Sequence, residues 1–141
     1  MDKTVKIVIV MALLAAVVVA VAVRRGGAGA QEVPEEYKPE QLTGKGQPLL
    51  VDLGSDTCVN CKMMISVIEE LRADYGDRLQ VEFLDVHKYP GLATMYGIKL
   101  IPTQIFYDGS GNELFRHEGF FSADDILAKW KELGVELAAA K

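Results

Sequence analysis

Residues 55–64, SDTCVNCKMM, contain both cysteines of the 141-residue chain. Cys58 and Cys61 are separated by two residues. The apolar run LLVDL at 49–53 precedes them and is typical of a buried strand. After them, apolar residues recur at the spacing of one helix face and stop before Gly76. The sequence therefore predicts that the cysteine pair lies where a strand passes into a helix.

The rest of the chain continues this alternation of strands and helices. We expect strands at 80–86, 104–107 and 113–117, a short helix at 90–96, and a last helix that begins near Ser122. The turn DGSGN at 108–112 joins the last two strands as a hairpin. The order β-α-β-α-β-β-α predicts an α/β fold with a mixed four-stranded central sheet flanked by helices.

The N-terminal residues 1–25 differ from the rest of the chain in that most of them are apolar. Ile7 to Val23 form a run of 17 residues without a charge, which as a helix is about 26 Å long. This is near the lower limit for crossing a bilayer. A cleaved signal segment is the alternative, because AGA at 28–30 offers a cleavage site. The run is longer than a usual signal core, so we favour one N-terminal transmembrane helix that anchors the protein.

The orientation of such an anchor is nearly balanced by charge. Two lysines precede the apolar run and two arginines follow it. The short N-terminal tail favours a single-pass protein with its folded domain on the extracytoplasmic side, and the cytoplasmic side stays open.

A linker is expected at 26–47, because this stretch is rich in glycine, proline and polar residues. It includes a short helical turn around Pro39 to Leu42. The folded domain is then expected at 48–141. From residue 31 onward the chain has 11 Lys and Arg against 19 Asp and Glu, a net charge of −8. Without a basic cluster, nucleic acid is excluded as a partner.

The position of the two cysteines predicts dithiol redox chemistry. Free N–H groups and the helix dipole at a helix N-terminus stabilise a thiolate, and Lys62 adds a cation. Cys58, in the first turn, is expected to attack a partner disulfide. Cys61, one turn deeper, is expected to resolve the mixed disulfide.

Three other uses of the cysteines are conceivable. A structural disulfide would close too small a loop to stabilise much. A metal site needs about four ligands, although the soft donors Met63 and Met64 make copper conceivable. A cysteine hydrolase needs a placed histidine, and we expect His87 and His117 on the surface of a loop and a strand.

Residues 48 to 135 resemble the thioredoxin family. VDLGSDTCVNCK at 51–62 is similar to the family's strand, loop and helix with its C-x-x-C pair. Asp52 stands six residues before Cys58, where the family has a buried acid. YGIKLIPT at 96–103 is similar to the family's cis-proline loop, with Pro102 following Cys61 by 41 residues.

The resemblance implies roles for further residues. Asp52 would lie beneath Cys61, relay its proton and have a raised pKa because burial disfavours the carboxylate. Pro102 would be cis and face the cysteines. The backbone of Ile101 would pair with an extended substrate segment. Thr57, beside the nucleophile, would belong to the same substrate-binding surface.

Several positions depart from the family pattern. Thr57 stands where the family commonly has Trp, and Gly54 replaces a second aromatic residue. Val59 and Asn60 lie between the cysteines in place of Gly-Pro. Phe83 aligns with a lysine that usually neighbours the buried acid. These changes predict a more open surface around Cys58 and an altered proton relay.

Together these observations predict a membrane-anchored thiol–disulfide oxidoreductase, with reduction favoured over oxidation. Its catalytic residues would be Cys58, Cys61 and Asp52, and it would need no organic cofactor and no metal. Its partners would be proteins that contain disulfides or dithiols, with a membrane thiol carrier as a further partner by analogy. The alternative is a copper- or zinc-binding module that uses the C-x-x-C pair without redox turnover.

Overall fold

The computed structural model describes residues 2–25 and 31–137, apart from the side chains of Lys6 and of residues 18–25. The chain divides into two compact units, Met1–Ala30 and Gln31–Lys141. The expected cleavage site at 28–30 lies outside the described residues.

The described part of the first unit forms the helix α1 (Lys3–Arg25). Its apolar side chains are exposed along the described part of the helix, as at Ile7, Val8 and Met11, which are 62%, 66% and 63% accessible. Over the described residues, no helix combines the length and the apolarity that a membrane crossing requires.

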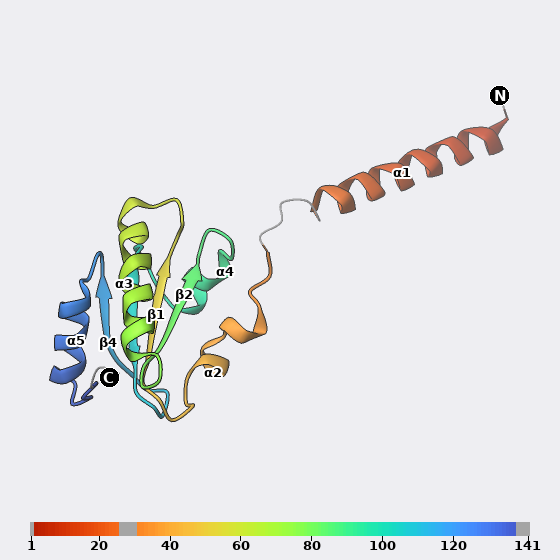
Figure 1. Ribbon diagram of the computed structural model, residues 1–141. Coiled ribbons are helices and arrows are strands. Elements are labelled where there is room, and N and C mark those ends of the chain that lie inside the picture. Colours follow the sequence, from red (N-terminus) through yellow and green to blue (C-terminus); the bar gives the residue numbers. More distant parts are fainter. Residues whose placement is uncertain (1, 26–30, 138–141) are drawn as a thin grey trace. The chain divides into compact units, whose positions relative to one another are not determined.

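The second unit is built on a four-stranded sheet (Figure 1). The strands are β1 (Leu49–Gly54), β2 (Gln80–Asp85), β3 (Thr103–Tyr107) and β4 (Glu113–Glu118). Their order is β2-β1-β3-β4, with β1 parallel to β2 and antiparallel to β3. β4 pairs antiparallel with β3. The predicted mixed four-stranded sheet is therefore confirmed.

Helices cover both faces of this sheet. α3 (Val59–Tyr75) and α5 (Ala123–Glu132) pack on one face through Met64, Ile68, Ile126 and Trp130. α4 (Gly91–Met95) and α2 (Pro39–Leu42) pack on the other through Leu92 and Leu42. A short 3-10 helix, η1 (Glu35–Tyr37), precedes α2. The ribbon in Figure 1 shows α3 running along the sheet, next to β1 in this view.

The expected linker at 26–47 overlaps this second unit, which begins at Gln31. Leu42 is only 6% exposed in the core, and Val33 packs against the same cluster. The Tyr96 hydroxyl donates a hydrogen bond to the carbonyl oxygen of Tyr37 at 2.7 Å. A few spaced apolar residues thus hold an otherwise polar segment on the domain, a pattern that composition alone hides. Residues 26–30 of the expected linker lie outside the described part.

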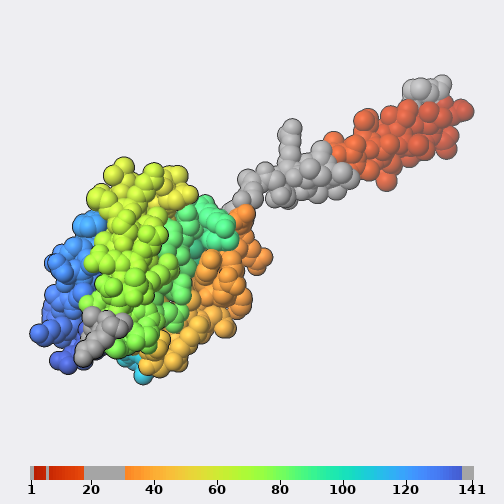
Figure 2. Space-filling view, in the orientation of Figure 1, coloured from red at the N-terminus to blue at the C-terminus, as the bar shows by residue number. Residues whose placement is uncertain are grey.

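The central strand β1 serves both layers of the core. Leu49, Val51 and Leu53 face the α2–α4 layer, whereas Leu50 faces the α3–α5 layer. Because side chains alternate along a strand, Asp52 points to the same side as Leu50, toward α3. The loop that joins β1 to α3 lies at one end of the domain. Its residues, coloured yellow, are seen at the surface in Figure 2.

Candidate active site

Cys58 is the residue that caps the N-terminus of α3. Its backbone is extended, with φ −86° and ψ 134°, and its sulfur accepts the backbone N–H of Cys61 at an N–S distance of 3.4 Å. Cys58 is half-buried, whereas Cys61 is completely buried. Both are free thiols. The predicted difference in access between the two sulfurs is present.

The two thiols differ in acidity as well. The pKa of Cys58 is lowered, first by a hydrogen bond from the Cys61 side chain and then by the backbone N–H groups of Cys61 and Asn60. The pKa of Cys61 is raised well above its ordinary value, first by burial and then by the hydrogen bond with Cys58. At neutral pH the accessible sulfur is therefore the better nucleophile, since the thiolate is the attacking species.

Asp52 lies in the middle of β1 and is fully buried. The strand register places it between Phe83 on β2 and Gln104 on β3. The Nε2 atom of Gln104 donates to its Oδ1 atom at 2.6 Å. Burial raises the pKa of Asp52 to about 7, and the Gln104 hydrogen bond acts in the opposite direction. The expected burial and raised pKa of Asp52 are confirmed; its role as proton relay stays a prediction.

Gly54 allows Asp52 and Cys61 to approach the same small volume. A Cβ atom at this position would lie 3.4 Å from Asp52 Oδ2, 3.3 Å from Cys61 Cβ and 3.0 Å from a ring carbon of Phe83. Such contacts are tight for any side chain. The glycine therefore keeps the carboxyl group and the buried cysteine next to each other.

The loop before β3 contains the predicted cis bond, between Ile101 and Pro102. Pro102 is buried and Ile101 is half-buried. The Thr103 hydroxyl donates to the Leu100 carbonyl oxygen at 2.6 Å, and the Gly119 N–H donates to the Pro102 carbonyl oxygen at 2.8 Å. One side-chain and one backbone hydrogen bond thus hold the loop in place. Substrate binding by Ile101, Pro102 and Thr57 stays a prediction.

A cluster of polar side chains in front of Cys58 was not anticipated. The Nδ1 atom of His87 lies 2.9 Å from Ser55 Oγ and 3.1 Å from Thr57 Oγ1, and the two hydroxyl oxygens are 2.9 Å apart. His87 is exposed on the loop after β2, as expected. It nevertheless connects that loop to the segment that leads into Cys58. The sequence gives no signal for this contact, because 30 residues separate Thr57 from His87.

The alternative uses of the cysteines find little support in the site. The Met64 sulfur is buried in the core and accepts the Phe121 N–H at 3.4 Å, so it is not free to bind copper. Over residues 2–25 and 31–137, no three His, Cys, Asp or Glu side chains gather at metal-binding distance. His117 lies on β4, half-buried, with its ring stacked on Phe121. Lys62 is exposed on the first turn of α3.

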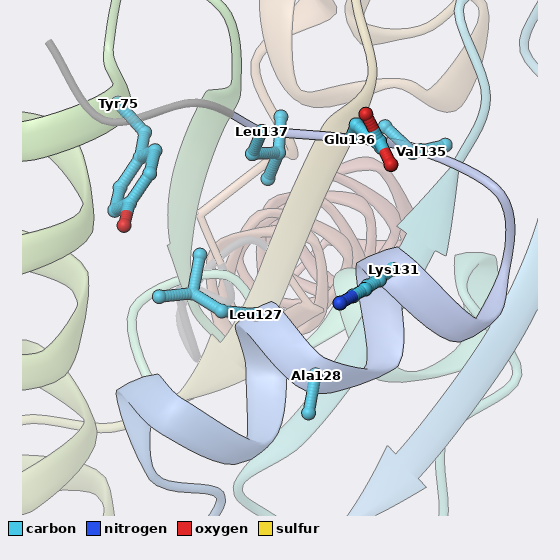
Figure 3. A pocket seen from close by; sticks show the side chains of 7 residues that line it. All are labelled: Tyr75, Leu127, Ala128, Lys131, Val135, Glu136 and Leu137. Carbon is cyan, nitrogen blue, oxygen red and sulfur yellow. The ribbon is translucent and has the colours of Figure 1, made fainter.

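A cavity of about 390 Å³ lies elsewhere, at the far end of α3. Figure 3 shows the side chains that line it, from Tyr75 on α3, from α5 and from the segment after α5. Cys58 caps the opposite end of this 17-residue helix, roughly 25 Å away at the usual rise per residue. The cavity is thus separate from the thiols.

An accessible thiol with a lowered pKa, a buried partner thiol and a buried acid beside it define the site of a thiol–disulfide oxidoreductase. The thioredoxin family model matches residues 30–132 of this chain. A thioredoxin-like protein of Synechocystis sp. is 33% identical over 88 residues, which cover 62% of this chain and 83% of that protein. The thioredoxin of Griffithsia pacifica is 41% identical over 71 residues, covering 50% of this chain and 65% of the relative.

The chloroplastic thioredoxin Y of Oryza sativa subsp. japonica is 32% identical over 88 residues, so that the match spans 52% of that protein and 62% of this chain. Among solved structures, thioredoxin-2 of the malaria parasite superposes with a TM-score of 0.57 at 26% identity, over 61% of this chain and 82% of its own. The chain belongs to the thioredoxin family.

Proposed function

We propose that this protein reduces disulfide bonds in partner proteins by thiol–disulfide exchange through Cys58 and Cys61. The asymmetry between the two sulfurs carries this proposal. Cys58 is accessible and has a lowered pKa, whereas Cys61 is buried and has a raised one. A dithiol needs this difference if one sulfur is to attack first and the other is to act second.

The exchange proceeds in two balanced steps. The Cys58 thiolate attacks one sulfur of a partner disulfide, so that a mixed disulfide forms and the other partner sulfur leaves as a thiolate, which takes a proton from water. Cys61 then loses its proton to Asp52 and attacks Cys58. The bond between Cys58 and the partner breaks, and the second partner sulfur leaves. The partner has gained two electrons, and this chain holds a Cys58–Cys61 disulfide.

The reductive direction is supported by the carboxyl group beside the dithiol. A negative charge at Asp52 disfavours a thiolate at Cys61 and is among the causes of its raised pKa. Cys61 therefore stays a neutral thiol at neutral pH and adds no thiolate stabilisation to the reduced form. Stabilisation of the Cys58 thiolate, in contrast, favours the reduced form and raises the potential. We expect a redox titration of the domain to give a potential below about −230 mV, and a value above about −180 mV would make the protein an oxidant.

The activity is tested by reduction of insulin with the dithiol form of residues 31–141, the unit that forms the compact domain. Turnover with dithiothreitol as the electron source, lost in Cys58→Ser, supports the proposal. A titration with copper(I) and zinc in the same preparation separates the metal-binding alternative. Tight binding of either metal without insulin reduction would overturn the redox assignment.

We also propose that α1 anchors the domain to a membrane, with the domain on the extracytoplasmic side. Support comes from its uncharged run of 17 residues and from the apolar side chains that are exposed along the helix. Exposed apolar surface of this extent needs a lipid or protein partner. Resistance of the full chain to carbonate extraction tests the anchor. Labelling of Cys58 in intact cells by a membrane-impermeant reagent, after reduction, tests the side.

An extracytoplasmic domain needs a source of electrons. We propose a membrane thiol carrier as the donor, which rests on the orientation and on analogy with other anchored thioredoxin-like proteins. Trapping of a mixed disulfide between Cys58 and an integral membrane protein would support this partner. If labelling places the domain in the cytoplasm, the carrier is removed from the scheme.

A further inference from the structure

Gln104 is a buried polar residue that the exchange cycle above leaves without a role. It is fully buried on β3 and is paired with Asp52 across the sheet. On the other side of Asp52, β2 presents the ring of Phe83, which has no hydrogen-bond donor. From α3, Cys61 is the titratable group that interacts with the carboxyl group. Gln104 is thus the side chain that supplies a hydrogen bond to Asp52.

The two oxygens of the Asp52 carboxyl group are in different surroundings. Oδ1 accepts the Gln104 amide at 2.6 Å. Oδ2 is buried and has no hydrogen-bond partner among the described residues. It is also the oxygen that borders the volume left open by Gly54, and the Cβ atom of Cys61 borders the same volume. The free oxygen therefore faces the buried cysteine.

We propose that Gln104 is a positioning residue for the proton transfer: its amide occupies Oδ1, so that Oδ2 takes the proton of Cys61. This inference rests on the proposed function. In the resolving step the S–H bond of Cys61 breaks and an O–H bond forms at Oδ2, directly or through one water. The electron pair of the S–H bond stays on sulfur, which attacks Cys58.

The geometry of the hydrogen bond explains the choice of oxygen. A proton on Oδ1 would point an O–H group at the N–H group of Gln104 across 2.6 Å, and one of the two donors would lose its acceptor. A proton on Oδ2 leaves Oδ1 as an acceptor. The bond to Gln104 therefore persists in both protonation states, and the carboxyl group keeps one orientation throughout the cycle.

The Gln104 amide also sets the fraction of protein molecules in which Asp52 is ionised. Burial raises the pKa of Asp52 to about 7, and the Gln104 hydrogen bond opposes that rise. Without the amide, burial would act alone, and Asp52 would be protonated in most molecules at neutral pH. Fewer molecules could then accept the Cys61 proton.

The test uses Gln104→Met, which keeps the length of the side chain and removes its donor. Residues 31–141 are given a mixed disulfide between Cys58 and thionitrobenzoate, and the release of thionitrobenzoate by Cys61 is followed from pH 5.5 to 9. We expect the midpoint of the pH profile to move upward and the rate at pH 7 to fall at least about three-fold, because less Asp52 is ionised. An unchanged profile would overturn the inference.

A matched pair of variants separates positioning from damage to the fold. In Asp52→Asn no carboxyl group remains to be positioned, so adding Gln104→Met should change the release rate less than two-fold. An equal slowing in both backgrounds would show that Gln104 acts on the fold and not through Asp52. Insulin reduction by the unmodified domain is measured alongside, since its absence overturns the proposed function and a failed pH shift overturns only this inference.

A second measurement needs no substitution at Gln104. The side-chain amide of Gln104 is followed by NMR while Asp52 titrates in the unmodified domain. We expect its two protons to shift at the Asp52 midpoint and to stay protected from exchange with water on both sides of it. Loss of this protection on the acid side would show that the hydrogen bond breaks when Asp52 is protonated, which would overturn the assignment of the proton to Oδ2.

Discussion

The backbone N–H of Cys61 points at the sulfur of Cys58, with an N–S distance of 3.4 Å. At a helix N-terminus, such a backbone N–H usually donates to the oxygen of a serine, threonine or aspartate side chain. Here the capping atom is the nucleophile itself. The same contact that begins α3 therefore stabilises the thiolate, and it does so for one sulfur of the pair only.

Substitution of each cysteine should have a different outcome. Cys61→Ser should trap a mixed disulfide with a partner protein through Cys58, because the attacking sulfur is intact and the resolving one is gone. Cys58→Ser should trap none, since Cys61 is completely buried. Non-reducing gels of both variants, after incubation with oxidised insulin, give the measurement. Equal trapping by the two variants would contradict the assigned order.

The stability of the domain should depend on Asp52 and on pH. Its pKa is about 7 in the folded protein and near 4 when unfolded, so the folded state binds the proton more tightly. Stability from this group is greatest below about pH 4 and is lost as the pH rises to 7. Asp52→Asn should therefore stabilise the domain by about 2–4 kcal/mol at pH 8, and by much less near pH 4.

Urea unfolding of the two proteins at both pH values checks this. Asp56→Asn is the matched control, because Asp56 is exposed four residues further along the chain. A stability gain of the same size at pH 4 and pH 8 would mean that the pKa of Asp52 is the same in the folded and unfolded states. The raised pKa would then be excluded.

Gly54→Ala should separate packing from proton transfer. The new methyl group would lie 3.0 Å from the Phe83 ring and 3.3 Å from Cys61 Cβ, so we expect a loss of about 1–3 kcal/mol of stability. It would also enter the volume between Asp52 and Cys61 and slow release of thionitrobenzoate. Adding Phe83→Leu should relieve the clash with the ring and recover stability. Recovery of the release rate to the original value would show that the methyl group does not obstruct the transfer.

His87→Ala should loosen the segment in front of Cys58. The substitution removes both contacts of the imidazole, to Ser55 and Thr57, whereas the contact between the two hydroxyls remains. We expect a loss of about 1 kcal/mol of stability and a slower reaction of Cys58 with iodoacetamide at pH 7. His117→Ala serves as the control. An unchanged alkylation rate in His87→Ala would show that the cluster does not influence the nucleophile.

Much of the site follows from periodicity and spacing along the chain. The strand before Cys58 and the helix after it fix the exposure of one thiol and the burial of the other. The resemblance to thioredoxins correctly implied the cis bond at Pro102 and the burial of Asp52. Each of these features depends on a short stretch of sequence or on one strand and the helix that follows it. They can therefore be predicted from a single sequence.

The side chains that these residues contact in the fold could not be predicted from the sequence in the same way. Gln104 reads as one polar residue in an apolar strand, and only the register of β1 against β3 shows that it meets Asp52. A polar residue in a strand buried on both faces was the available signal, since such a residue needs a polar partner. The contact of His87 depends on how two loops meet. The packing of Leu42 depends on the whole α2–α4 layer.

Because side chains alternate along β1, the two faces of this strand can be altered independently of each other. Positions 49, 51 and 53 belong to one half of the core, whereas Asp52 and Gly54 belong to the half that contains Cys61. Residues adjacent in sequence are thus insulated from one another by the thickness of the sheet. Substitutions at 52 and 54 could therefore change the reactivity of the thiols without changing the packing at 51 and 53. Substitutions at 49, 51 and 53 could in turn raise the stability of the α2–α4 layer without changing the thiol–disulfide exchange.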